Sequence, residues 1–223
     1  MELVELSDYR LAPIGDGKGI RDCRFSISRG DIYSIDAALP DDAKLFLRAL
    51  ATLAKPLRGT YRFQGEQLDF SDYRRLLPIK RRIAYIAPDA ALLSNRTLIE
   101  NLLLPRSYFE NVSDWDLPDD LAELCREFRI TERLNLRPGE AAHEDVRLTV
   151  LLRELSKKPD LLLLERPRDF LTSRNFDVFA GVLKGMTQTG IPAVFLDPDS
   201  AAACRFPVKV VRIADGSLQT ENS

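Results

Sequence analysis

The sequence lacks any apolar run long enough to cross a bilayer and any large surplus of one charge. Apolar runs such as 161–164 (LLLL) are far shorter than the roughly 20 residues of a spanning helix. Lys and Arg number 32 against 34 Asp and Glu, which gives a net charge of −2. This balance excludes bulk attraction to nucleic acid or anionic lipid. The first ten residues contain no apolar leader segment, so we expect no signal peptide.

Cysteine and histidine are also scarce. Cys23, Cys125 and Cys204 lie far apart in the sequence and form no C-x-x-C pair. This spacing predicts reduced thiols in a cytosolic protein. The single histidine, His143, has no Cys or His neighbour in the sequence, so we expect a surface residue and no metal site.

Glycine is missing where the local pattern would normally require it. A short β-rich run, 30–35 (GDIYSI), precedes the segment 36–44 (DAALPDDAK), and an amphipathic helical pattern follows. A phosphate-binding loop in that setting is rich in glycine and ends in Lys-Ser or Lys-Thr. This segment instead has two adjacent aspartates. Pro40, Asp41 and Asp42 favour a closed helix start, in which the carboxylates accept hydrogen bonds from the helix N–H groups.

The remaining pattern predicts an α/β domain. Length and composition, 223 residues with 45% apolar side chains, fit one soluble domain with a sizeable core. The apolar runs at 160–165 and 191–197 are typical of parallel strands buried on both faces. Alternating strands near the N-terminus predict an antiparallel flank, and the segment 208–220 predicts a hairpin turning at Asp215-Gly216. Further strands are expected at 2–10, 23–29, 30–35, 59–65 and 81–87, and helices at 41–54, 94–104, 119–128, 145–155 and 175–186.

The order of these segments resembles the ATP-binding cassette (ABC) transporter ATPase. The resemblance rests on several matching segments in one order: 20–35 (IRDCRFSISRGDIYSI), 58–68 (RGTYRFQGEQL), 83–105 (IAYIAPDAALLSNRTLIENLLLP) and 157–167 (KKPDLLLLERP). It covers essentially the whole chain. It implies an ABC ATPase-like, P-loop-type α/β fold with a mixed sheet core and one domain over 1–223. A helical subdomain would be inserted at roughly 89–157.

The resemblance aligns the nucleotide motifs with residues that lack the required chemistry. The Walker A loop falls on 37–44, where Ala37, Pro40 and Asp42 replace glycines, Ala43 takes the lysine position and Lys44 the Ser/Thr position. In the family, backbone N–H groups there cradle phosphates. Pro40 removes one such donor, and the aspartates would repel phosphate.

The other family motifs are altered as well. The Q-loop glutamine falls on Pro88, and the signature motif falls on 141–145, where Glu144 and Asp145 would repel a phosphate. The Walker B pair falls on Glu165 and Arg166. An arginine cannot act as the general base, because its guanidinium stays protonated. The switch histidine falls on Pro198. We therefore expect no catalytic residue and no bound cofactor.

Two further features resemble nucleotide contacts without the right context. The segment 15–19 (GDGKG) contains Gly-Lys, but no Ser or Thr follows and no helical pattern opens there, so we expect a hairpin turn. Tyr9 lies near the family's adenine-stacking aromatic. It could equally be a strand residue that faces the sheet.

The segment 90–105 keeps the family pattern. In the family this region helps to receive the permease, which implies a docking role here. Apolar residues such as Leu98 and Leu102 could be core, but several polar residues also match, and packing would not require them. The residues expected to dock are Leu92, Leu93, Asn95, Arg96, Thr97, Glu100 and Asn101. The sequence at 100–109 (ENLLLPRSYF) resembles the corresponding segment in ATPase subunits of bacterial mammalian-cell-entry-type lipid transporters and of the lipoprotein-releasing branch.

Three functions follow as hypotheses. The first is a catalytically inactive ABC subunit of a bacterial membrane transporter, peripheral to the cytoplasmic membrane, bound to a permease and paired with itself or another ABC-like chain. The second is a divergent ATPase that retains Lys44 and Glu165. The third is a free-standing interaction protein. For the first, we expect Arg166 to form an ion pair with Asp41, Asp42, Asp197 or Asp199, replacing nucleotide and metal with internal charge pairing.

Overall fold

The computed structural model describes residues 2–110, 115–196 and 198–221, and contains two sheets. A four-stranded antiparallel sheet has the order β2-β1-β4-β5, and a six-stranded sheet has the order β10-β9-β3-β8-β7-β6. Neighbouring strands from β9 to β6 run parallel, and β10 runs antiparallel to β9. The expected mixed sheet with an antiparallel flank is confirmed.

The strands follow the sequence pattern closely. Short buried strands of the central sheet are rich in Leu, Ile and Val, whereas longer strands of the flank alternate between buried and exposed residues. The strands are β1 (Glu2–Leu11), β2 (Ile20–Ser28), β3 (Ile32–Ala37), β4 (Arg58–Phe63), β5 (Glu66–Gln67), β6 (Ile83–Ile86), β7 (Leu161–Leu164), β8 (Ala193–Phe195), β9 (Lys209–Ala214) and β10 (Ser217–Glu221).

The helices lie mainly between β6 and β7 and after β7. The expected helix at 94–104 is in fact two short helices, α3 and α4, preceded by a turn, and α2 and α8 had no sequence prediction. The helices are α1 (Pro40–Leu50), α2 (Leu77–Arg81), α3 (Leu98–Leu102), α4 (Leu104–Glu110), α5 (Asp119–Glu127), α6 (His143–Leu155), α7 (Ser173–Gln188) and α8 (Pro198–Ala203).

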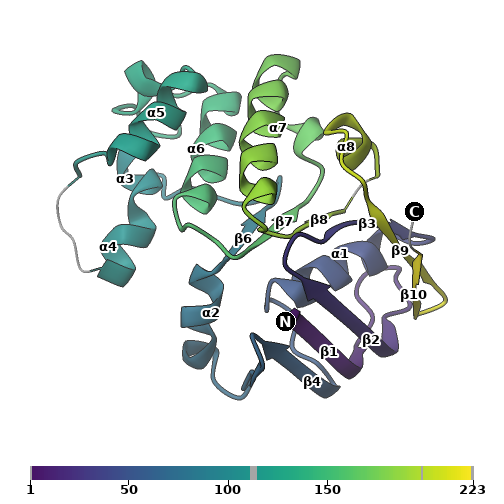
Figure 1. The fold of residues 1–223 in the computed structure, drawn as a ribbon. Coiled ribbons are helices and arrows are strands. Elements are labelled where there is room, and N and C mark those ends of the chain that lie inside the picture. Colours follow the sequence, from purple (N-terminus) through teal and green to yellow (C-terminus); the bar gives the residue numbers. More distant parts are fainter. Residues whose placement is uncertain (1, 111–114, 197, 222–223) are drawn as a thin grey trace.

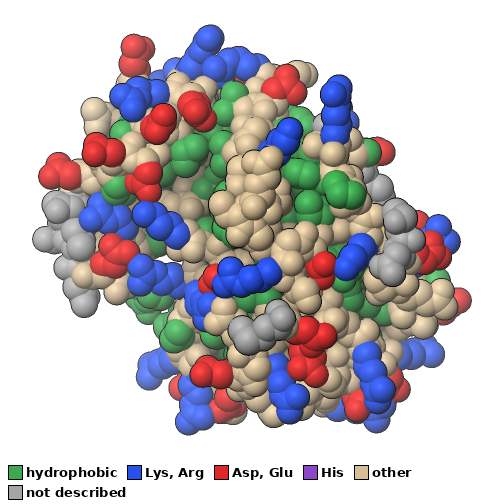
Figure 2. All heavy atoms as spheres, viewed as in Figure 1, with side chains coloured by type: hydrophobic (Ala, Val, Ile, Leu, Met, Phe, Trp, Pro, Cys, Tyr) green, Lys and Arg blue, Asp and Glu red, His purple; other side chains and the backbone are tan. Residues whose placement is uncertain are grey.

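The central sheet separates two hydrophobic cores. Leu161, Leu163 and Val194 face α1 and the antiparallel sheet, whereas Leu162 and Leu164 face the core that the helices α3, α5, α6 and α7 complete. Figure 1 shows α3 to α7 at one end of the molecule and β1, β2 and β4, with α1 beside them, at the other. On the face in Figure 2, basic and acidic side chains are interspersed, in keeping with the balanced composition. None of the helices in the described ranges is long and apolar enough to span a bilayer.

Candidate functional site at the carboxyl ends of β3 and β7

The candidate site lies where the parallel strands β3 and β7 end. In open α/β sheets this edge is where loops gather and ligands usually bind. The segment after β3 leads into α1, and Glu165 follows β7 directly. The site therefore combines the start of α1 with the residues that follow β6 and β7.

The first turn of α1 is covered by the loop that joins β1 and β2. The Asp16 N–H donates to Asp41 Oδ2 at 2.8 Å, and the Gly19 N–H donates to Asp42 Oδ1 at 2.9 Å. Asp42 is buried. The approach is close, because a Cβ added at Gly17 would lie 2.5 Å from Asp42 Oδ1. We call this loop, residues 12–19, the glycine loop.

The expected capping role of Asp41 and Asp42 is wrong. The N-cap residue is Leu39, which has no side-chain acceptor, and neither carboxylate accepts a hydrogen bond from the helix backbone. A side-chain cap comes from the N-cap position itself, whereas these aspartates are the second and third residues of α1. Their oxygens therefore take donors from the glycine loop. The segment 15–19 is the expected turn, but its contact with α1 was not predicted.

A second set of side chains surrounds Glu165, whose exposed fraction is 5%. Tyr85 Oη donates to Glu165 Oε2 at 2.6 Å, and Lys44 Nζ lies 3.5 Å from Glu165 Oε1. Lys44 Nζ also donates to Asp89 Oδ2 at 3.3 Å. One ammonium thus bridges a buried carboxylate and an exposed one.

The electrostatics around Glu165 follow from this geometry. Burial alone would lower the pKa of Lys44, but Glu165 and Asp89 outweigh it and raise the pKa. Burial, and then the hydrogen bond to Glu165, raise the pKa of Tyr85, so the phenol stays protonated and remains a donor. Lys44 is therefore charged at neutral pH and neutralises the buried carboxylate.

The expectation for Arg166 fails at the three candidate aspartates that the structure describes, Asp41, Asp42 and Asp199. Arg166 is exposed, adopts φ 46°, and lies 4.0 Å from the Asp169 carboxylate. Among the described residues it forms no ion pair with Asp41, Asp42 or Asp199, and Asp197 lies outside the described ranges. The left-handed backbone conformation and the short 3₁₀ turn that follows place the side chain at the surface. Lys44 supplies the internal cation that was expected from Arg166.

Comparisons with known proteins support one fold. The chain superimposes on the ATP-binding cassette MJ0796, in a dimeric post-hydrolysis state bound to ADP and Pi, with a TM-score of 0.81, 18% identity and 98% coverage of both chains. It also superimposes on cbiO1 from Clostridium perfringens with a TM-score of 0.71 and 16% identity, covering 99% of this chain and 88% of that one. The chain has the ATP-binding cassette fold.

Sequence comparison finds distant relatives among proteins described as ATP-binding components of transporters. The chain is 26% identical over 231 residues to the macrolide export ATP-binding/permease protein MacB of Syntrophobacter fumaroxidans, covering 100% of this chain and 32% of that protein. It is 25% identical over 197 residues to the uncharacterized ABC transporter ATP-binding protein YvcR of Bacillus subtilis, covering 88% and 76%. The chain spans about a third of the length of the MacB relatives. No protein-family model matches the chain.

The other residues that the resemblance aligns with the Walker A loop, the Q-loop and the switch histidine are alanines and prolines, which carry no side-chain ligand for phosphate or metal. Ala43 is buried in the core, Ala37 is half-buried at the end of β3, and Pro40 begins α1. Pro88 is half-buried after β6. Pro198 begins α8, and its side chain is outside what the structure describes.

The segment aligned with the cassette signature has internal partners for both acids. Glu144 accepts from the Thr172 hydroxyl at 2.7 Å and from Asn175 Nδ2 at 2.6 Å, at the start of α7. Burial would raise the pKa of Glu144, but these hydrogen bonds outweigh it and lower the pKa. Asp145 is buried, with Oδ2 2.8 Å from Arg133 Nε. These acids stabilise the packing of α6 against its neighbours.

The structure places Tyr9 in the core and His143 at the surface. Tyr9 is fully buried and packs edge-to-face against Tyr61, with ring centroids 6.3 Å apart. The adenine-stacking alternative is therefore excluded, and the strand-residue alternative is correct. His143 is exposed at the start of α6, as expected.

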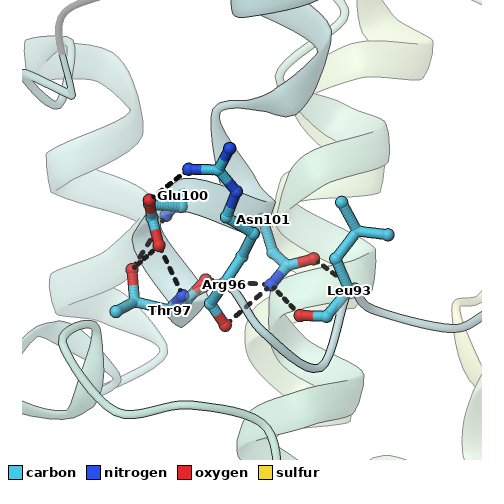
Figure 3. A network of polar contacts seen from close by, with 5 residues as sticks. All are labelled: Leu93, Arg96, Thr97, Glu100 and Asn101. Atoms are coloured by element: carbon cyan, nitrogen blue, oxygen red, sulfur yellow. Dashed lines mark hydrogen bonds and ion pairs between the residues drawn. The ribbon is translucent and has the colours of Figure 1, made fainter.

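The segment expected to dock a permease is held together by its own polar side chains (Figure 3). Thr97 and Glu100 form a capping box at the start of α3, and Arg96 pairs with Glu100 at 2.8 Å. Asn101 is fully buried. It accepts from the Leu93 N–H at 2.7 Å and donates to the carbonyls of Leu93 and Thr97 at 3.0 and 2.9 Å.

The argument that packing does not require these polar residues is therefore wrong. Thr97, Glu100 and Asn101 each satisfy backbone groups of the turn and of the helix start. Arg96 pairs with Glu100, and Leu92 is half-buried against the helical core. Leu93, Asn95 and Arg96 are exposed, so these three of the expected docking residues are accessible to a partner.

Chemical labelling of the three cysteines tests which parts of the core are buried. No disulfide joins them. Burial raises the pKa of Cys23 to about 12 and that of Cys125 to about 11, so both thiols stay protonated near neutral pH. We expect a thiol reagent such as DTNB to modify at most Cys204 rapidly in the native protein, and all three thiols in denaturant. Rapid labelling of Cys23 or Cys125 without denaturant would contradict this burial.

Proposed function

We propose that the chain is a catalytically inactive ATP-binding cassette subunit, with a structural or regulatory role in a bacterial membrane transporter. The observation that carries the proposal is the Lys44 ammonium between Glu165 and Asp89. In a working cassette, the aligned acidic residue faces a metal ion. Here its carboxylate already has an internal cation and a phenol donor.

The residues at the site do not fit a magnesium nucleotide. Asp41 and Asp42 place carboxylates at the start of α1, where a phosphate would need backbone donors and positive charge. The glycine loop covers the same helix start. We therefore derive no hydrolytic step for this chain.

The proposed loss of nucleotide-binding chemistry affects both halves of a cassette dimer site. In the family each site combines the Walker motifs of one chain with the signature of the other. The acids aligned with the signature here, Glu144 and Asp145, are bonded to Asn175 and Arg133. Pairing this chain with an active partner would leave both sites incomplete, so we infer that ATP-driven transport involving it would use another ATPase pair.

The transporter context is proposed from the relatives. MacB is described as an ATP-binding/permease protein, and cbiO1 as part of an ABC transporter complex. We propose that this chain associates with a permease at the cytoplasmic face of the membrane, through a helical subdomain at roughly 89–157. It would pair with itself or with another cassette chain. Lipid transport is our proposal for the system, based on the resemblance of the segment 100–109.

The proposal is tested by nucleotide binding and turnover. We expect no saturable binding when the protein is titrated with labelled ATP and Mg²⁺ up to millimolar nucleotide concentration. We also expect no phosphate release above background. The matched control is Lys44→Ala, because the divergent-ATPase hypothesis relies on Lys44. Turnover by the native chain that disappears in Lys44→Ala would overturn the proposal in favour of a working ATPase.

A permease partner is tested separately. Co-purification of the tagged chain with an integral membrane protein encoded beside it would support the transporter role. A monodisperse chain that recovers no membrane protein under these conditions would favour the free-standing interaction protein.

A further inference from the structure

A second surface, around the C-terminal end of α1, combines exposed leucines with basic residues. It is formed by the end of β1, the C-terminal part of α1 and the segment between α1 and β4 (Figure 1). Leu53 and Leu57 on that segment have exposed fractions of 45% and 63%. We call this surface the leucine face, comprising Arg10, Pro13, Ile14, Arg48, Leu53, Lys55 and Leu57.

The leucine face has two shallow hollows that share Leu11. One, of about 260 Å³, is lined by Ile14, Leu45 and Leu53, with Arg48 and Lys55 also in its wall. The other, of about 290 Å³, is lined by Arg10, Pro13 and Leu57, and its wall also contains Lys18, Arg21 and Asp22. Both are smaller than the usual site for a small organic ligand. The surface is better suited to a broad contact than to an enclosed molecule.

The basic residues of the leucine face lack carboxylate partners. Within the described parts of the chain, no Asp or Glu oxygen forms an ion pair with Arg10, Arg48 or Lys55. The nearby acids are already engaged, since Asp22 pairs with Arg58 and Asp215 with Lys18. The surface therefore offers apolar side chains and cations, and few acceptors.

The backbone at the base of the segment is strained. Thr52 adopts φ 57°, a conformation that β-branched residues rarely adopt. Its hydroxyl is buried and finds no hydrogen-bond partner within the described ranges. Such strain persists only where the surrounding structure fixes it. It turns the chain sharply after α1, so that Leu53 and Leu57 project outward.

We propose that the leucine face binds the surface of an anionic membrane, with Leu53 and Leu57 at the acyl boundary and Arg10, Arg48 and Lys55 against lipid phosphates. A protein interface usually offers both donors and acceptors. A bilayer surface offers anionic oxygens above apolar chains, and this matches a face of cations around exposed leucines. The inference does not depend on the loss of ATPase activity. It also differs from the expectation drawn from net charge, because the cations are local.

Vesicle sedimentation tests the proposal. We expect the full chain to sediment with vesicles of phosphatidylcholine and phosphatidylglycerol, but not with phosphatidylcholine alone, and to dissociate at high salt. Leu53→Ser with Leu57→Ser should lower the partition coefficient by about tenfold. Replacing Arg10, Arg48 and Lys55 by Gln should lower it by about 100-fold.

The matched controls replace exposed apolar side chains that lie outside the leucine face. Leu93→Ser and Tyr108→Ser alter side chains with exposed fractions of 49% and 66%, and should leave vesicle binding unchanged. Far-UV circular dichroism and thermal unfolding check that each variant is folded. Sedimentation that is absent, independent of phosphatidylglycerol, or equal in the leucine variants and controls overturns the proposal. Absence of binding would leave an acidic protein segment as the alternative occupant.

Discussion

Asn101→Ala is expected to lower the free energy of unfolding by about 3 kcal/mol. The Asn101 side chain is fully buried and bonds both the N–H and the carbonyl of Leu93, as well as the carbonyl of Thr97. Alanine leaves these backbone groups without partners in a site that has little room for water. Urea unfolding, monitored by circular dichroism, measures the change through the transition midpoint.

The neighbouring Asn95→Ala is the control for Asn101. Asn95 is exposed in the same segment, so its removal should change the free energy of unfolding by less than about 0.5 kcal/mol. If both alanine variants shift the midpoint equally, the polar network in Figure 3 does not determine the stability of this region.

Lys44→Met is expected to cost about 2 kcal/mol of unfolding free energy, whereas Arg166→Ala should cost less than about 0.5 kcal/mol. Methionine keeps the aliphatic length of Lys44 but removes the cation that neutralises buried Glu165. The cost is below that of a fully buried pair, because the Lys44 side chain is partly exposed. Arg166 makes only a long contact with Asp169 at the surface.

A double-mutant cycle makes the second prediction specific. Glu165→Gln removes the negative charge but can still accept from Tyr85 Oη. In that background, Lys44→Met should cost about 1 kcal/mol less than in the native chain, because no buried charge is stranded. Additive effects in the cycle, or an Arg166→Ala effect as large as that of Lys44→Met, would refute the assignment of Lys44 as the internal cation.

The sequence predicted the architecture well because the signals were local. Continuous apolar runs marked β7 and β8, and alternation marked β1 and β2. Helices such as α5, α6 and α7 followed their apolar periodicity. The short helices α2, α4 and α8, of five to seven residues, have too few turns to show a period.

The details of the site could not be predicted, because they depend on side-chain direction and on contacts distant in sequence. The two prolines at 88 and 198 and the acidic loop were evident, but the donors to Asp41 and Asp42 lie 25 and 23 residues away. From the sequence, Arg166 is expected to supply the internal cation, and Lys44 is retained only in the divergent-ATPase hypothesis. The left-handed backbone at Arg166 and the short turn after it leave no pattern in the sequence.

The contact between the glycine loop and α1 also bears on how this chain could change over evolutionary time. A glycine at position 42 would leave the Gly19 N–H without its acceptor, and larger residues at Gly15 or Gly17 would collide with the carboxylates of Asp41 and Asp42. A change on one side of the contact, in α1 or in the glycine loop, is therefore destabilising unless the other side changes as well. The substitutions in these two segments are epistatic. If the chain has lost nucleotide binding as proposed, regaining it would therefore require coordinated changes in both segments.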